Sequence, residues 1–187
     1  MRIFIFRHGR TTFNRDDKFT GIIDAPLVKS GRSEAKIIAE RLKRKKFSVA
    51  FQTSLRRSKD TLKIVLKHHP ECKKIFTDDR MTERDYGRLN GKTHEYIVKK
   101  YGAAKYDYLH RGFRARPPGG ESFADVEKRV RSFIKYLKKM AKSQKGSIVI
   151  SAHGNSIRLF RKILEKATPQ EAVSWTIPYD NYYEYVI

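Results

Sequence analysis

Two histidine–glycine pairs occur in matching contexts in this sequence. His8-Gly9 follows the β-branched and aromatic run 2–6, and His153-Gly154 follows the apolar run 147–152. Each run predicts a short buried strand that opens into a loop or a helix. A lone histidine there is typically a hydrogen-bonded loop residue, but two in matching contexts favour a shared site. Because ligands bind at the carboxyl ends of strands in open α/β sheets, we expect His8 and His153 to meet there.

Paired histidines beside arginines indicate phosphoryl transfer. A neutral imidazole presents a nucleophilic lone pair near pH 7, and the P–N bond that it forms stays labile enough to pass the group onward. A phosphoryl group carries about two negative charges, so guanidinium groups are the expected companions. Arg7 adjoins His8, and Arg57 lies where a second strand gives way to a helix. We therefore predict that His8 carries a phosphoryl group, with His153 beside it.

Two further features fit this chemistry. Gly9 and Gly154 allow the backbone to pass close to a phosphate, and the N–H groups of a helix after His153 would attract the anion. A proton must also reach or leave the substrate oxygen. Glu83, in the segment Glu83-Arg84-Asp85-Tyr86-Gly87, is the candidate acid and base. At this point an exposed, solvated glutamate is an equally good interpretation of Glu83.

The elements that must position these residues alternate along the chain. Apolar patterns predict strands at 2–6, 47–51, 74–76, 147–152 and 182–187, and helices at about 30–46, 53–69, 93–101, 121–143, 155–164 and 168–175. The stretch 77–120 is polar, broken by glycine and proline, and contains only the short helix at 93–101. This alternation predicts an α/β fold, a three-layer sandwich with a mostly parallel sheet flanked by helices, in a single domain spanning 1–187.

Composition narrows the kinds of partner. Forty-two Lys and Arg residues against 20 Asp and Glu give a net charge of +22, and this charge is spread along the whole chain. It predicts an anionic partner. The single cysteine, Cys72, excludes an intrachain disulfide and fits a reducing, cytoplasmic setting, and no Cys/His spacing suits a structural zinc. No apolar run approaches the roughly 18 residues of a membrane span. We expect a small phosphorylated substrate, no membrane partner, and a monomer or homodimer.

Seven segments together resemble the histidine phosphatase superfamily, and within it the cofactor-dependent phosphoglycerate mutases. They are Arg7-His8-Gly9 with Asn14, Phe19-Thr20-Gly21 with Asp24 and Leu27, Thr53 to Arg57, Glu83 to Gly91, Arg111-Gly112-Phe113, Ala152 to Ser156, and Ile177-Pro178. The resemblance covers nearly the whole chain. It implies the phosphoglycerate mutase-like form of the α/β sandwich.

The resemblance also implies roles for individual residues. His8 would be the phosphorylated nucleophile, Glu83 the acid and base, and Arg7, Arg57 and His153 the residues that hold the phosphoryl group. The implied substrate-binding residues are Asn14, Thr20, Gly21, Arg84, Tyr86, Lys92, Arg111, Gly154 and Asn155. No metal would be needed, and in a mutase 2,3-bisphosphoglycerate would prime the histidine.

Three departures from the mutase pattern leave the acceptor of the phosphoryl group open. His110 stands where mutases place the first of two arginines, and His94 matches their lysine, with Lys92 nearby as a substitute. The third is that the long insertion of many mutases is missing, and a short lid would admit water. We favour interconversion of 3- and 2-phosphoglycerate over the alternative, a phosphomonoester phosphatase. A basic nucleic-acid-binding protein on this scaffold is a remote alternative, which only the +22 charge supports.

Overall fold

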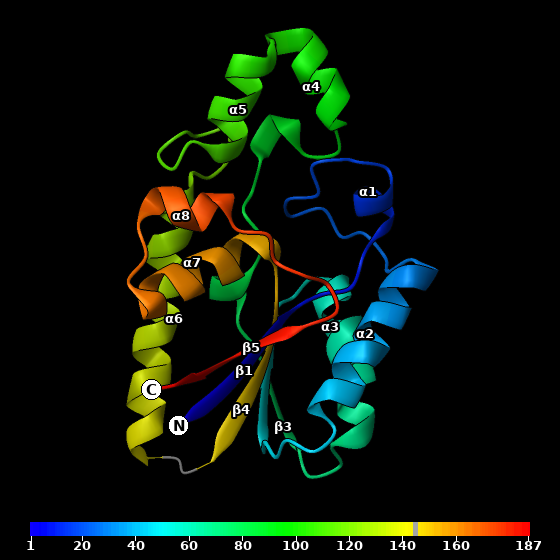
Figure 1. Ribbon diagram of the computed structural model, residues 1–187, viewed down its shortest axis with the longest axis vertical. Coiled ribbons are helices and arrows are strands. Elements are labelled where there is room, and N and C mark those ends of the chain that lie inside the picture. The colour runs from blue at the N-terminus through cyan, green and yellow to red at the C-terminus, as the bar shows by residue number, and fades with distance from the viewer. Residues whose placement is uncertain (144–145) are drawn as a thin grey trace.

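The computed structural model describes residues 1–143 and 146–187, and its centre is a five-stranded sheet. The strands are β1 (Arg2–Arg7), β2 (Val49–Gln52), β3 (Lys74–Thr77), β4 (Ser147–Ala152) and β5 (Tyr182–Val186), in the order β3-β2-β4-β1-β5. The first four run parallel, whereas β5 pairs antiparallel with β1 at the edge (Figure 1). The prediction of a mostly parallel α/β sheet is confirmed.

Helices cover both faces of this sheet (Figure 1). On one side lie α2 (Lys29–Leu42) and α3 (Arg56–Val65), and on the other α6 (Phe123–Ser143), α7 (Gly154–Glu165) and α8 (Pro169–Ser174). Alternate residues of β1 face opposite ways: Ile3 and Ile5 join the core beneath α6 and α7, while Phe4 and Phe6 join the core beneath α2 and α3. Both cores are apolar because both faces of a parallel sheet are covered.

Beyond the carboxyl ends of the parallel strands the chain builds a helical cap. It consists of α4 (His94–Tyr101) and α5 (Ala103–Arg111), which lie at the end of the molecule beside the short helix α1 (Thr12–Arg15) (Figure 1). A small apolar cluster that contains Phe19, Leu89, Ile97 and Leu109 ties the cap to the segment after α1. Three 3-10 turns complete the elements: η1 (Leu66–His68), η2 (Asp79–Met81) and η3 (Gly87–Leu89).

Several element boundaries differ from the sequence prediction. The helix predicted to reach 46 ends at Leu42, because the lysine-rich residues after it offer no apolar side chain to bury. The second strand begins at Val49, and Phe47 is buried in the core before the strand starts. The sequence did not predict α5, since Leu109 is its one fully buried residue and gives no helical periodicity. In the described part of the chain, no helix is both long and apolar enough to cross a membrane.

Candidate active site

The two predicted histidines lie side by side at the carboxyl ends of neighbouring strands. β1 and β4 are paired in parallel with Arg7 opposite Ala152, so His8 and His153 leave the sheet together. Their ring centroids are 5.0 Å apart. Both residues are buried, with 2% of His8 and none of His153 exposed. The fold therefore brings together two residues that the sequence only placed in similar contexts.

The environment of His8 leaves one ring nitrogen free. The Nδ1 atom lies 2.8 Å from the carbonyl oxygen of Gly9, and in the tautomer that donates this hydrogen bond Nε2 keeps its lone pair. Burial, followed by the charges of Arg57 and Arg7, holds the pKa of His8 well below its usual value. A neutral ring with a free Nε2 is the form that a nucleophilic histidine needs.

The backbone beside His8 is held by close packing. A Cβ on Gly9 would lie 2.1 Å from the carbonyl oxygen of Gly31, so a side chain cannot be accommodated there. The Gly9 N–H also donates to the hydroxyl of Thr61 at 3.1 Å. Glycine at position 9 is thus required by the approach of α2, in addition to any contact with a phosphate.

His153 is hydrogen-bonded through both ring nitrogens. Its Nε2 lies 2.8 Å from the Thr53 hydroxyl, and its Nδ1 accepts from Arg57 Nε at 3.3 Å. Burial and the nearby charge of Arg57 hold the pKa of His153 well below its usual value. The ring is neutral and fixed in orientation next to His8.

Two arginines flank the histidine pair without a carboxylate partner among the described residues. Arg57 is fully buried, and its terminal nitrogens donate to the carbonyl oxygens of Ile23 (2.6 Å) and Gly21 (2.7 Å). Arg7 donates to the carbonyl oxygen of Ile177 at 3.1 Å, while its Nε is buried with no partner in the described structure. The pKa of Arg57 is lowered to about 10, mainly by burial. The two positive charges are available to an anion.

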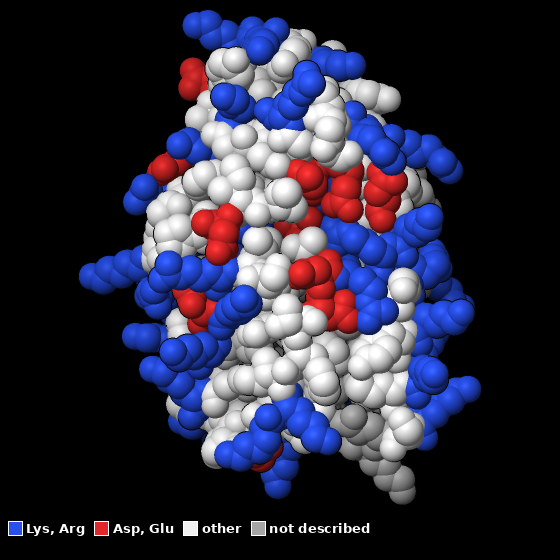
Figure 2. Space-filling view, turned by 180° about the vertical axis from the view of Figure 1, so that it is seen from behind, with Lys and Arg blue, Asp and Glu red and all other residues white. Residues whose placement is uncertain are grey.

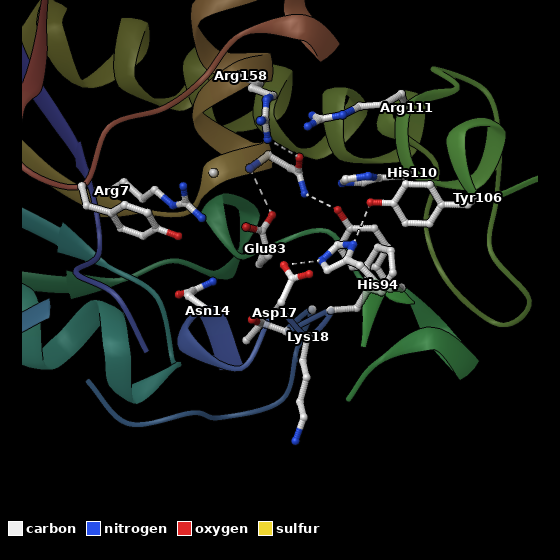
Figure 3. Close-up of a pocket in the computed structure, with 17 residues that line it drawn as sticks. Arg7, Asn14, Asp17, Lys18, Glu83, His94, Tyr106, His110, Arg111 and Arg158 are labelled. Atoms are coloured by element: carbon white, nitrogen blue, oxygen red, sulfur yellow. Dashed lines mark hydrogen bonds and ion pairs between the residues drawn. The ribbon is translucent and has the colours of Figure 1, made fainter. Parts of the chain in front are cut away.

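Glu83 is buried and held at one oxygen only. Its Oε1 accepts from the backbone N–H of Arg84 at 2.7 Å and from that of Asn155 at 3.1 Å. The second contact ties Glu83 to the start of α7, directly after His153. Its other carboxylate oxygen has no partner in the described structure, and Glu83 points into the cavity (Figure 3). The surface-glutamate interpretation is excluded, since 7% of Glu83 is exposed.

A cavity of about 360 Å³ opens above these groups (Figure 3). Nine of the residues predicted to form the site line it: Arg7, Asn14, Thr20, Gly21, Glu83, Tyr86, Arg111, Gly154 and Asn155. His8, Arg57 and His153 are buried next to this lining. Thr20 contributes a hydroxyl that is buried and unpartnered in the described structure. The Tyr86 hydroxyl accepts from the Asn155 amide at 3.0 Å.

Two predicted substrate-binding residues lie elsewhere. Arg84 is fully buried and donates to four backbone carbonyl oxygens, those of Leu109, His110, Ala115 and Glu121. Four of its five N–H donors are thereby used within the protein, and it joins the cap to the segment before α6. Lys92 is not among the cavity residues, and its ammonium group lies 5.7 Å from the centre of the Tyr96 ring. Neither side chain lines this cavity, and the substrate-binding roles that the resemblance implies for them stay predictions.

The cavity also contains residues that the sequence did not identify as a site. Arg158 donates to Asn155 Oδ1 at 2.7 Å, and burial together with the charge of Arg111 lowers its pKa to about 10. Its position three residues after Asn155 in a helix was the available signal, because that spacing places both on one face. Tyr179 lies in an irregular segment, where no periodicity points to it, with its ring 3.8 Å from the Arg7 guanidinium carbon.

The outer wall of the cavity consists of uncharged rings. His94 and His110 lie 5.2 Å apart, and the Tyr106 hydroxyl is 2.8 Å from His94 Nδ1 (Figure 3). Burial lowers the pKa of His94, and burial with the charge of Arg111 lowers that of His110 to about 3. Both imidazoles are therefore neutral at pH 7. The cations of the outer cavity are Arg111, Arg158 and Lys18, with Asp17 opposite.

Residues 3–186 match the family model of the histidine phosphatase superfamily (branch 1). The chain belongs to this superfamily. A relative from Gloeobacter violaceus, named 2,3-bisphosphoglycerate-dependent phosphoglycerate mutase 2, is 33% identical over 180 residues, which cover 95% of this chain and 81% of the relative. The resemblance seen in the sequence is confirmed, and the protein is an enzyme of this superfamily.

Solved structures of the superfamily include phosphatases. The mycobacterial glucosyl-3-phosphoglycerate phosphatase in complex with VO3 superposes with a TM-score of 0.83 and 26% identity, over 94% of this chain and 85% of that one. The alpha-ribazole phosphatase from Shigella flexneri gives a TM-score of 0.83 over 98% and 89%, and its 20% identity supports the fold alone. The histidine phosphatase fold is thus shared by mutases and phosphatases.

Proposed function

We propose that this histidine phosphatase interconverts 3- and 2-phosphoglycerate through a phosphohistidine on His8. The observation that carries the proposal is the spacing of charge in one cavity. Arg7 lines the cavity and Arg57 is buried behind the lining near His8, whereas Arg111 and Arg158 line another part of the cavity, and none of the four is in an ion pair within the described residues. A substrate with an anionic group at each end matches this arrangement.

The first half-reaction uses the residues at the floor. His8 Nε2 attacks one phosphorus of 2,3-bisphosphoglycerate, a P–N bond forms, and the P–O bond to the departing phosphoglycerate breaks. Arg7 and the charge of Arg57 would stabilise the oxygens of the transferred group. Because Nδ1 of His8 is held by the Gly9 carbonyl, the ring presents Nε2 without reorientation.

The proton goes through Glu83. When the P–O bond breaks, the leaving oxygen needs a proton, and the unpartnered carboxylate oxygen of Glu83 faces the cavity. When the phosphoryl group passes from His8 to the free hydroxyl of a bound phosphoglycerate, the same oxygen removes the proton of that hydroxyl. Two backbone N–H groups hold the opposite oxygen, so the geometry of the acid and base is preserved through both steps.

Isomerisation requires that the substrate stay bound while its hydroxyls exchange places. Arg111 and Arg158 would hold the carboxylate, and Tyr86, Thr20 and Asn155 would contact the glycerate carbons and oxygens. With 2,3-bisphosphoglycerate as primer, one phosphate would occupy the floor and the rest of the molecule the outer cations. The four arginines fit a molecule with that charge distribution.

Hydrolysis of phosphomonoesters is the second candidate. This candidate is supported by the neutral outer wall of the cavity. His94 and His110 carry no charge at pH 7, so they do not attract a second anionic group of the substrate. If the dephosphorylated substrate dissociated early, water could hydrolyse the phosphohistidine. On the face seen in Figure 2, Lys and Arg side chains are scattered among acidic and uncharged surface, so no single basic patch on that face supports nucleic-acid binding as the main function.

A coupled assay separates the two candidates. Conversion of 3- to 2-phosphoglycerate is measured with and without 2,3-bisphosphoglycerate, and phosphate release is measured from the same substrates. Isomerisation that the bisphosphate stimulates, and that exceeds phosphate release, supports the mutase. Phosphate release that exceeds isomerisation under all conditions assigns the protein to the phosphatases.

A further inference from the structure

A second cavity of about 550 Å³ lies apart from the active site, along the outer side of α3 and the edge strand β3. We call it the α3 groove, and none of its lining residues lines the active-site cavity. It is lined by Gln52, Lys59, Leu62, Lys63, Leu66, Lys67, His69, Pro70, Cys72, Lys73 and Ile75. Its volume lies within the roughly 300–1,000 Å³ that ligand pockets occupy.

The floor of the α3 groove is apolar. Leu62 and Leu66 come from α3 and the turn after it, and Ile75 of β3 is 49% exposed beside them. An aliphatic side chain this exposed on an edge strand leaves apolar surface in contact with water. A ligand with a hydrocarbon body would cover that surface.

Lysines form the rim. Lys59 and Lys63 are four residues apart in α3 and so share one side of that helix, Lys67 lies in the turn η1 that follows, and Lys73 lies just before β3. None of the four takes part in an ion pair in residues 1–143 and 146–187. The two nearest carboxylates in sequence are already engaged, Asp60 with Arg56 and Glu71 with His69.

A buried polar atom also lacks a partner here. His69 is 2% exposed and lines the α3 groove, and its Nε2 has no hydrogen bond in the described structure. Its other ring nitrogen, Nδ1, lies 3.1 Å from the Glu71 carboxylate. A buried nitrogen without a partner costs free energy that a ligand could recover.

We propose that the α3 groove binds a small amphipathic anion, with its hydrocarbon body on Leu62, Leu66 and Ile75 and its anionic head among the four lysines. Charge favours this occupant over a second copy of the protein, because two such rims would repel one another. Figure 2, which views the molecule from behind, shows blue Lys and Arg side chains beside uncharged white surface on its lower half.

Cys72 serves as a reporter of occupancy. It is the one cysteine of the chain, it lines the α3 groove, and burial raises the pKa of its thiol to about 11. The anionic probe is decanoate, and the control is decanol, which has the same hydrocarbon chain but no charge. Decanoate should slow the reaction of Cys72 with a thiol reagent, bind in calorimetry, and leave turnover at His8 unchanged. Decanol should bind at least about tenfold more weakly.

Two pairs of lysine variants distinguish binding in the α3 groove from a general effect of the protein's positive charge. Lys63→Gln with Lys67→Gln should raise the dissociation constant of decanoate about tenfold, whereas Lys138→Gln with Lys139→Gln on α6 should not change it. Equal effects of the two pairs, equal binding of decanol, or no protection of Cys72 would overturn the proposal. A dimer that shields Cys72 without decanoate would also overturn it, because the occupant would then be a second copy of the protein. Binding to anionic vesicles that needs the same lysines would overturn it too, because the occupant would then be a membrane surface.

Discussion

The rings of His8 and His153 lie 5.0 Å apart at the ends of two strands that are direct neighbours in the sheet. Each ring is buried, each is close to Arg57, and the pKa of each is held below its usual value. Neutral imidazoles therefore lie beside two guanidinium groups, and this combination suits the binding of a phosphoryl group.

Glu83→Gln should slow phosphoryl transfer. The amide keeps the size of the side chain and can still accept from the backbone N–H groups of Arg84 and Asn155, but it cannot carry the proton. We expect the rate of substrate turnover to fall roughly 10²- to 10⁴-fold, while the midpoint of unfolding stays unchanged. Rapid-quench measurement of substrate turnover checks this. An unchanged rate would remove Glu83 from the mechanism.

Arg111→Ala should weaken the grip on the carboxylate end of the substrate. One of its nitrogens is held by the Val173 carbonyl, and the guanidinium faces the cavity. Loss of a charge-assisted hydrogen bond predicts a decrease of about ten- to a hundredfold in kcat/KM for phosphoglycerate. A phosphomonoester without a carboxylate should be affected far less. Arg114→Ala, exposed nearby and outside the cavity, is the matched control. Equal losses on both substrates would contradict a carboxylate-binding role.

Arg84→Met should affect stability. The guanidinium satisfies four buried carbonyl oxygens, which methionine would leave without donors. We expect the free energy of unfolding to fall by about 2–5 kcal/mol in urea titrations. The exposed Arg88→Met is the control and should stay within about 0.5 kcal/mol of the wild type. If Arg84→Met instead raised KM at unchanged stability, the substrate-binding role expected from the resemblance would be supported.

Acid should destabilise the fold through His110. Its pKa is about 3 in the folded state against 6.5 for the ordinary side chain. Between those values the unfolded chain binds a proton that the folded chain does not, so the stability present above pH 6.5 is lost as the pH falls. Each such proton contributes a slope of about 1.4 kcal/mol per pH unit. His110→Gln should flatten the pH dependence of urea unfolding between pH 6.5 and 4, and identical slopes would refute this.

The sequence revealed the part of the site that sits on regular strands. The apolar runs before His8 and His153 have a clear strand pattern, and the ends of parallel strands meet at one edge of the sheet. The sequence therefore predicted that the two rings lie close together. Glu83 was a candidate from its loop segment, whereas Asn155 was found through the resemblance alone, because its contact with Glu83 joins a loop to a helix far along the chain. No local pattern encodes that contact.

The positions of the other side chains depend on packing that the sequence does not show. Arg84 and Arg57 are both buried arginines in polar stretches, yet one turns to the carbonyls of the cap and the other to His153. Their sequence contexts do not distinguish these outcomes. Tyr179 and α5 were missed because an irregular segment and a helix with one fully buried residue give little periodic signal. The single domain and the cytoplasmic setting stay predictions.

The most direct test of the central claim is the covalent intermediate. The protein is incubated with 2,3-bisphosphoglycerate, quenched in base, and analysed by mass spectrometry of its peptides. We predict one phosphoryl group on His8, stable in base and lost in acid, which His8→Ala abolishes together with turnover. A His8→Ala variant that still turns over substrate, or a phosphoryl group found on another residue, would contradict the account.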